Sequence, residues 1–173
     1  RPAEWKAKYY VGLIYWGKGR VEETSALFDA CDQADFAPFY LARAALRRET
    51  APERARADYE RALELEPKAW RPWHALIDFE RSHDKPGRAL QTAKQAGATL
   101  PDNVLIRVDL VKALLDAHLF SEAADVLDKV EALPFEGASE LHSLYVRAHL
   151  ALAVEAMKNR NWPSALRELE RSK

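Results

Sequence analysis

The sequence predicts an all-α fold, a right-handed α-solenoid of about five helical hairpins. Three observations lead to this prediction. Small residues and prolines return at a fixed spacing along the 173 residues. Within most stretches, apolar residues recur at positions i, i+3 and i+4, which places them on one face of a helix. No stretch sustains the alternation of apolar and polar residues that a half-buried strand requires.

The spacing of the repeated positions is 34 residues, as in the step from Ala55 to Ala89 (89 − 55 = 34). Several independent columns share this offset: Ala55, Ala89 and Ala123; Tyr59, Ala93 and Leu127; Phe39, Trp73 and Arg107; Pro52 and Pro86; Pro67 and Pro101. Agreement among separate columns argues against coincidence. A period of about 34 residues is that of a helix–turn–helix repeat.

The residue types in these columns have physical reasons. A small residue such as Ala55 lets the second helix of a hairpin approach the first closely. Pro52 is placed near the start of that second helix, where its missing N–H would have had no partner in any case. Pro67 follows the second helix, and proline cannot continue helical hydrogen bonding. The columns therefore mark the starts and ends of hairpins.

The repeats are predicted as a single array, at about residues 5–35, 36–69, 70–103, 104–137 and 138–173. The last step, from Ala123 to Ala165, is 42 residues instead of 34. The eight extra residues (42 − 34) predict a first helix in the last repeat that is about two turns longer than the others. The chain begins at Arg1 without an initiator Met, and we expect it to be excised from a longer protein.

The segments "ADYERALELEPKAWRPWHALIDFE" and "KPGRALQTAKQAGATLPDN" resemble the tetratricopeptide repeat (TPR) family, and the resemblance extends over nearly the whole chain. It implies stacked hairpins whose first helices line a concave face, where extended peptides bind. Three positions depart from the family pattern. Arg43 and Ile77 occupy the early small-residue position, and Glu80 occupies a position that is usually aromatic. These departures put in doubt a regular superhelix through the second and third repeats.

A narrower resemblance comes from "APFYLAR", "WRPWHALIDF", "LPFEGASELH" and "AHLALAVEAMKNRNWPSALRELERS". These segments resemble the C-terminal repeat region of large uncharacterised bacterial proteins whose N-terminal part is β-rich and similar to carbohydrate-processing enzymes. The resemblance implies an alternative function, an accessory domain that supports a catalytic domain absent from this chain. It transfers no catalytic residue.

The repeat register places ten residues on the concave face as candidates for partner binding: Tyr9, Trp16, Tyr40, Arg47, Arg48, Arg71, His74, Asp78, Arg81 and Lys112. Arg presents a bidentate fork to carboxylates, and Tyr and Trp present large amphipathic faces. We therefore expect a non-catalytic scaffold that binds a protein or peptide, or another domain of the same polypeptide. The alternative is that these side chains are only solvated or paired between helices.

Two further groups of residues are candidates for contacts, either with a partner or within the core. Phe135, Glu136 and His142 are predicted to dock on a neighbouring domain, because they belong to an irregular loop at the start of the last repeat. Trp73 and Trp162 fall in columns that pack hairpins together, and we expect them in the core. Trp16 and Trp70 are instead candidates for partner contact.

The composition argues against nucleic-acid and membrane partners. Lys and Arg (26) nearly balance Asp and Glu (27), so the net charge of −1 supplies no overall attraction for phosphate backbones. The arginines between Arg43 and Arg56 are interleaved with acidic residues, which favours ion pairing along helices. No segment approaches the run of about 18 apolar residues that a membrane helix needs. The composition suits a bacterial cytoplasm or periplasm, with the cytoplasm slightly favoured.

The sequence contains no recognisable catalytic, cofactor or metal motif. GxSxG, P-loop and GxGxxG patterns are missing, as are HExxH and CxxC spacings. His142 and His149 share a helix face, but seven residues separate them by about 10 Å, too far to bind one ion together. We therefore expect no enzyme activity, cofactor or metal, and the oligomeric state remains open.

Overall fold

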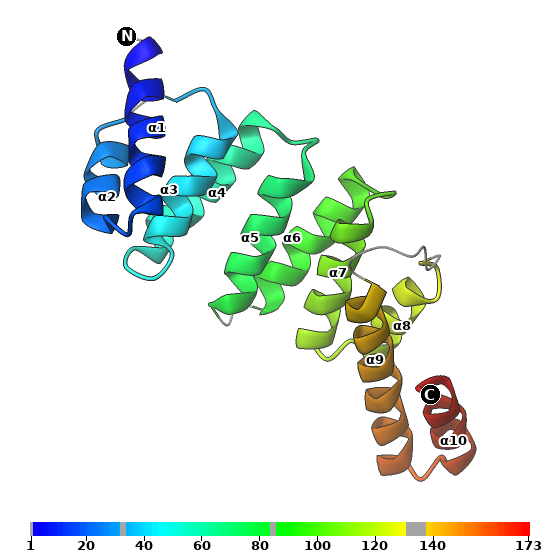
Figure 1. The fold of residues 1–173 in the computed structure, drawn as a ribbon. Coiled ribbons are helices and arrows are strands. Elements are labelled where there is room, and N and C mark those ends of the chain that lie inside the picture. The colour runs from blue at the N-terminus through cyan, green and yellow to red at the C-terminus, as the bar shows by residue number, and fades with distance from the viewer. Residues whose placement is uncertain (1, 32–33, 84–85, 131–137) are drawn as a thin grey trace. The chain divides into compact units, whose positions relative to one another are not determined.

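The computed structural model describes residues 2–31, 34–83, 86–130 and 138–173, and all regular secondary structure in these ranges is α-helical. The helices, shown in Figure 1, are α1 (Pro2–Gly17), α2 (Val21–Asp29), α3 (Ala37–Arg47), α4 (Pro52–Leu65), α5 (Trp70–Ser82), α6 (Pro86–Thr99), α7 (Val104–Asp116), α8 (Phe120–Leu127), α9 (Ala138–Lys158) and α10 (Trp162–Arg171). The predicted class, an all-α solenoid of about five helical hairpins, is confirmed.

Consecutive helices form the hairpins: α1 packs on α2, α3 on α4, α7 on α8 and α9 on α10. The chain divides into two compact units, residues 1–79 and 80–173, and α5 extends across the division. Each unit has its own core and is described by itself.

Aromatic side chains fill the core of the first unit. The rings of Phe28 and Phe39 are fully buried, with their centroids 5.4 Å apart. A second cluster joins the next hairpin, where the rings of Tyr59 on α4 and Phe79 on α5 lie 5.3 Å apart. Aromatic pairs in tilted arrangements add to the apolar area that they bury, so these contacts hold successive hairpins together.

Aliphatic side chains fill the core of the second unit. Leu114 and Leu115 on α7 pack with Leu127 on α8 and with Leu141 and Leu144 on α9. The predicted small-residue column is buried throughout the chain: Ala55, Ala89 and Ala123 are 0% exposed, and Ala165 is 3% exposed. This burial agrees with the close helix approach expected there.

The lengthened helix of the last hairpin is present. Helix α9 has 21 residues, whereas α7, the first helix of the preceding hairpin, has 13. The eight additional residues carry α9 beyond the turn between α7 and α8, and α10 folds back along this extension.

The departures from the TPR pattern are accommodated within the core. Ile77 is fully buried. Glu80, 2% exposed, accepts a hydrogen bond of 2.7 Å from the hydroxyl of Thr92 on α6, so the buried carboxylate has a polar partner. Arg43 is paired with Asp58 of α4. The polar departures are therefore built into the contacts between helices.

Candidate partner-binding surface

Two of the predicted groove residues belong to the core. Tyr9 is 8% exposed and Tyr40 is 6% exposed. The ring of Tyr9 packs against those of Phe28 and Phe39, with centroids 6.0 Å from each, and burial raises the pKa of its hydroxyl. The prediction that Tyr9 and Tyr40 offer a binding face is wrong, because the aromatic core of the first unit covers both.

The predicted carboxylate-binding arginines of the first unit are engaged in ion pairs. Arg47, whose side chain is 16% exposed, donates from Nη1 to Oδ2 of Asp58 at 2.7 Å and also pairs with Asp29 on α2. Arg48 lies with its Nη1 3.3 Å from Oδ2 of Asp78 on α5. A partner carboxylate would have to compete with these aspartates.

The second unit repeats this arrangement. Nε of Arg81 donates to Oδ2 of Asp116 at 2.7 Å, and Nζ of Lys112 lies 2.6 Å from Oε1 of Glu140. The pairs Arg48–Asp78, Arg81–Asp116 and Lys112–Glu140 join the first helices of successive hairpins. The sequence left open whether the charged groove residues only pair between helices. In the structure, Arg48, Asp78, Arg81 and Lys112 do pair between helices.

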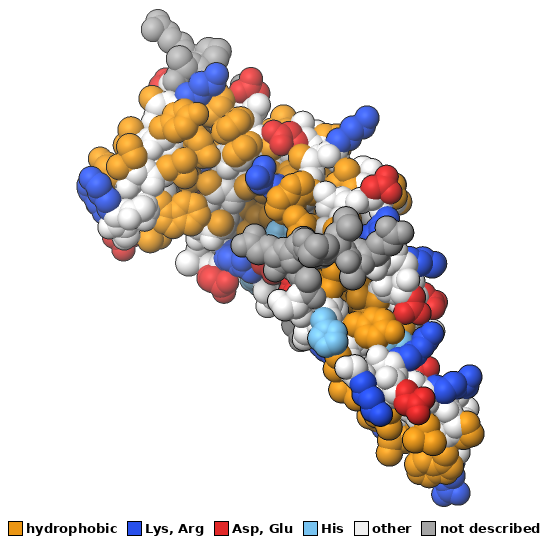
Figure 2. All heavy atoms as spheres, turned by 45° about the vertical axis from the view of Figure 1, so that its right-hand side comes forward, with side chains coloured by type: hydrophobic (Ala, Val, Ile, Leu, Met, Phe, Trp, Pro, Cys, Tyr) orange, Lys and Arg blue, Asp and Glu red, His pale blue; other side chains and the backbone are white. Residues whose placement is uncertain are grey.

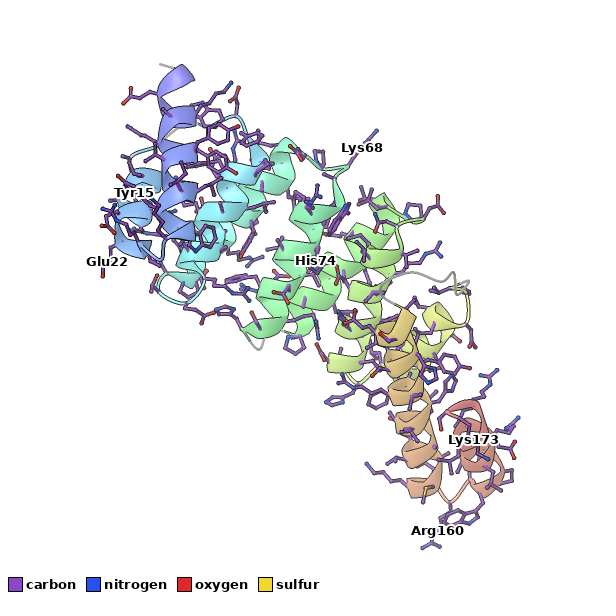
Figure 3. The ribbon with its side chains drawn as sticks, in the orientation of Figure 1. Tyr15, Glu22, Lys68, His74, Arg160 and Lys173 are labelled. Carbon is purple, nitrogen blue, oxygen red and sulfur yellow. The ribbon has the colours of Figure 1, made fainter. Side chains whose placement is uncertain are left out.

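Four other candidates keep accessible surface in the first unit. Arg71 and His74 are exposed, and Trp16 and Trp70 are partly buried. The guanidinium of Arg71 lies 5.2 Å from the ring centroid of Trp70, and the rings of Trp70 and His74 are 5.9 Å apart. Trp70, Arg71 and His74 form a small cluster at the start of α5, where Figure 3 labels His74.

An apolar stripe on α9 was missed by the sequence reasoning. Leu150, Val154 and Met157, here called the α9 stripe, are 42%, 49% and 45% exposed. Counted back by the 42-residue step, Val154 lies in the column of Lys112, whereas Leu150 and Met157 lie in the columns of Val108 and Leu115, which are buried in the core. The i, i+4 and i+7 spacing is present in the sequence, but the exposure of this face depends on how α9 packs against its neighbours.

A hollow of about 350 Å³ adjoins the α9 stripe. It lies between α9 and the turn that joins α7 to α8, and its lining residues are His118, Phe120, Leu150, Ala151, Val154, Glu155 and Lys158. A lining that combines apolar side chains with the charged Glu155 and Lys158 is typical of a surface that receives a side chain from a partner.

The remaining predicted contacts have mixed outcomes. Phe135 and Glu136 lie outside the described residues, and His142 is exposed near the start of α9. Trp73 is in the core as predicted, with its Nε1–H donating to the carbonyl of Pro67 at 2.9 Å. Trp162 is 57% exposed, so its predicted core position is wrong; no helix of the described chain covers this side of α10.

Within the described ranges, no group of three or more His, Cys, Asp and Glu side chains is arranged to bind a metal ion. None of the described helices combines the length and the apolar character that crossing a membrane demands.

Comparison with known proteins identifies solved structures with a similar fold. No protein-family model matches the sequence, and no curated protein matches it. Solved structures of MamA do match. MamA from AMB-1 has a TM-score of 0.66 at 19% identity, covering 99% of this chain and 91% of that chain. MamA residues 41-end from Desulfovibrio magneticus RS-1 has a TM-score of 0.64 at 14% identity, covering 98% and 97%.

The chain has a TPR-type fold. At these identities, the likeness to MamA extends to the fold alone. The functional surfaces must therefore be argued from this chain's own residues.

Proposed function

We propose that this TPR-type array is a non-catalytic interaction scaffold, which holds a protein or peptide against the face lined by the first helices of its hairpins. The observation that carries the proposal is the α9 stripe. Three apolar side chains at i, i+4 and i+7 are each more than two-fifths exposed, next to an apolar hollow. A clustered apolar surface rimmed by charge is typical of a protein-interaction site.

The geometry of the α9 stripe defines the chemistry of its partner. Leu150 and Met157 are seven residues apart, or about 10 Å along the helix axis. A partner segment with two or three apolar side chains over that length would match the α9 stripe, and the adjoining hollow would receive one large side chain. Met157 is flexible and polarisable, which suits a contact that adapts to its partner. Glu155 and Lys158 at the rim would pair with polar groups of the same segment.

The cluster of Trp70, Arg71 and His74 is a second proposed contact within the first unit. Its stacked Trp and Arg are residue types enriched among the strongest contacts of protein interfaces. The paired groove residues Arg47, Arg48, Asp78, Arg81 and Lys112 have a different proposed role. Within each unit, the pairs of Arg48, Arg81 and Lys112 orient neighbouring first helices, and those of Arg47 join α3 to the second helices α2 and α4.

The partner can be a separate protein or another domain of the same polypeptide. In the second case, the proposal includes the alternative drawn from the narrower sequence resemblance, in which the array supports a β-rich carbohydrate-active domain. One capture experiment distinguishes the two, because mass spectrometry of the retained protein identifies which kind of partner binds.

The test is capture of partners on the immobilised chain from extracts of the source cells, followed by affinity measurement with the purified partner. Val154→Asp places a charge in the α9 stripe and should raise the dissociation constant about tenfold or more. Val21→Asp is the matched control, because Val21 is 48% exposed and Val154 is 49% exposed, and it should bind as the unaltered chain does. A partner retained equally by Val154→Asp contradicts the proposed site.

A further inference from the structure

Helices α1 and α10 carry exposed apolar side chains on faces that no described helix covers. On α1, Tyr10 is 59% exposed and Ile14 is 57% exposed; together with Val11, at 40%, they form what we call the N-terminal face. On α10, Leu166 is 62% exposed and Leu169 is 37% exposed, and these two form the C-terminal face. Hydrophobic side chains gather over both terminal hairpins in Figure 2.

The residues of the C-terminal face stand in columns that are covered elsewhere in the array. Leu169 lies 42 residues after Leu127, and so shares a column with Tyr59, Ala93 and Leu127, which are 3%, 0% and 6% exposed. Leu166 lies 42 residues after Ala124, which is 5% exposed and belongs to the core that α8 forms with α7 and α9. In the internal hairpins, this side of the second helix is covered by neighbouring helices.

The residues of the N-terminal face stand in the complementary columns. The register from the first hairpin to the third is 31 + 34 = 65 residues, which aligns Val11 with Leu76 and Ile14 with Phe79. Leu76 and Phe79 are each 4% exposed, because they pack in one cluster with Tyr59 on the preceding hairpin. In the third hairpin, the side of α5 that carries Leu76 and Phe79 is therefore covered by the second hairpin.

The C-terminal face and the N-terminal face correspond to the two sides of the contact between α4 and α5. Tyr59 and Phe79 meet inside the array with ring centroids 5.3 Å apart. Leu169 occupies the column of Tyr59, and Ile14 occupies the column of Phe79. The contact that joins α4 to α5 can thus form between α10 of one chain and α1 of another, with aliphatic side chains in place of the aromatic pair.

We propose that the chain binds a second copy of itself head to tail, with the C-terminal face of one copy covering the N-terminal face of the next. The binding partner is a second copy because one chain carries both sides of a contact that already joins α4 to α5 within the array. The contact is heterologous, so each copy keeps one open face available for a further copy. It uses none of the α9 stripe residues, so it stands apart from the proposed partner site.

The test is sedimentation velocity of the full chain over a range of concentrations. The unaltered chain should shift from one copy toward larger species as its concentration rises. Ile14→Asp and Leu166→Asp should each remain monomeric, because each lacks one half of the joint. Mixed together, the two variants should form a complex of two copies and no larger species, since one intact face of each kind remains. This rescue by mixing separates a head-to-tail contact from one in which each face binds its own kind.

Two control variants test whether a loss of self-association is specific to the N-terminal and C-terminal faces. Leu105→Asp alters a leucine of α7 that is 43% exposed and outside both faces, and it should associate as the unaltered chain does. Val154→Asp should also associate normally, which separates this proposal from the partner site. Circular dichroism verifies folding, and Tyr10→Asp replaces Ile14→Asp if that variant does not fold. The proposal is overturned by an unaltered chain that stays monomeric, by self-association of either single variant, or by a mixture of folded variants that stays monomeric.

Discussion

Arg43 on α3 holds both carboxylate oxygens of Asp58 on α4, with Nη2 2.5 Å from Oδ1 and Nε 2.9 Å from Oδ2. Its Nη1 donates to the carbonyl oxygens of Phe28, at 3.4 Å, and Cys31, at 3.1 Å, where α2 ends. Burial lowers the pKa of the Arg43 guanidinium, but the hydrogen bonds and charge of Asp58 outweigh burial, and the pKa rises. One side chain therefore ties three helices of the first unit together.

Removal of Asp58 should destabilise the first unit strongly. Asp58→Ala leaves Arg43 and Arg47, whose side chains are 14% and 16% exposed, without their shared carboxylate. We expect a loss of about 3–5 kcal/mol in the free energy of unfolding, because a mostly buried charge loses its partner. Urea denaturation followed by circular dichroism measures the change. Glu60→Ala, which removes the pair between the exposed Glu60 and the partly buried Arg56, should cost less than about 1 kcal/mol. Equal effects from the two substitutions would show that the Asp58 pairing adds no more stability than the Glu60–Arg56 pair.

Gly12 should resist enlargement. A Cβ placed on Gly12 would lie 2.4 Å from Cε1 of Phe28, a fully buried ring held in place by Tyr9 and Phe39. Gly12→Ala should therefore cost about 1–3 kcal/mol of stability. A Cβ on Gly87, in the first turn of α6, would meet nothing within 4 Å, so Gly87→Ala should stabilise the chain by up to about 1 kcal/mol. Thermal unfolding of the two variants should give opposite shifts in Tm, and a harmless Gly12→Ala would refute the close approach.

The last hairpin depends on a polar pair. His149 on α9 is 0% exposed, and its Nδ1 lies 2.6 Å from Oε2 of Glu168 on α10. Glu168→Ala would leave that ring nitrogen in the core without its partner, at an expected cost of about 1–3 kcal/mol. Glu170→Ala, an exposed change two residues away, should be nearly neutral. Hydrogen exchange of α9 and α10 measures the effect locally, and unchanged protection in Glu168→Ala would count against the pair.

The sequence predicted the features that depend on spacing. The 34-residue period located the hairpins, and the 42-residue step predicted the additional turns of α9. The same periodicity placed Leu150, Val154 and Met157 on one face of α9, at i, i+4 and i+7. These features follow from local helical geometry, which a single sequence carries in its periodicity.

Features that depend on neighbours in space were not predicted. The repeat column of Tyr9 indicates which face of α1 its side chain is on. It does not reveal that the rings of Phe28 and Phe39 cover that side chain. Arg43 departs from a small-residue column and was expected to form ion pairs along helices, but its partner Asp58 lies 15 residues away on another helix. Trp162 occupies a column expected to pack hairpins, yet no described helix covers it.

The central claim is that the α9 stripe contacts a partner, and site-specific photo-crosslinking in the source cells tests it most directly. A photoreactive amino acid would replace Val154 in one sample and the equally exposed Val21 in another. The account predicts a discrete crosslinked protein from position 154 that is missing from position 21. No crosslinked species from position 154, or the same set of species from both positions, would contradict it.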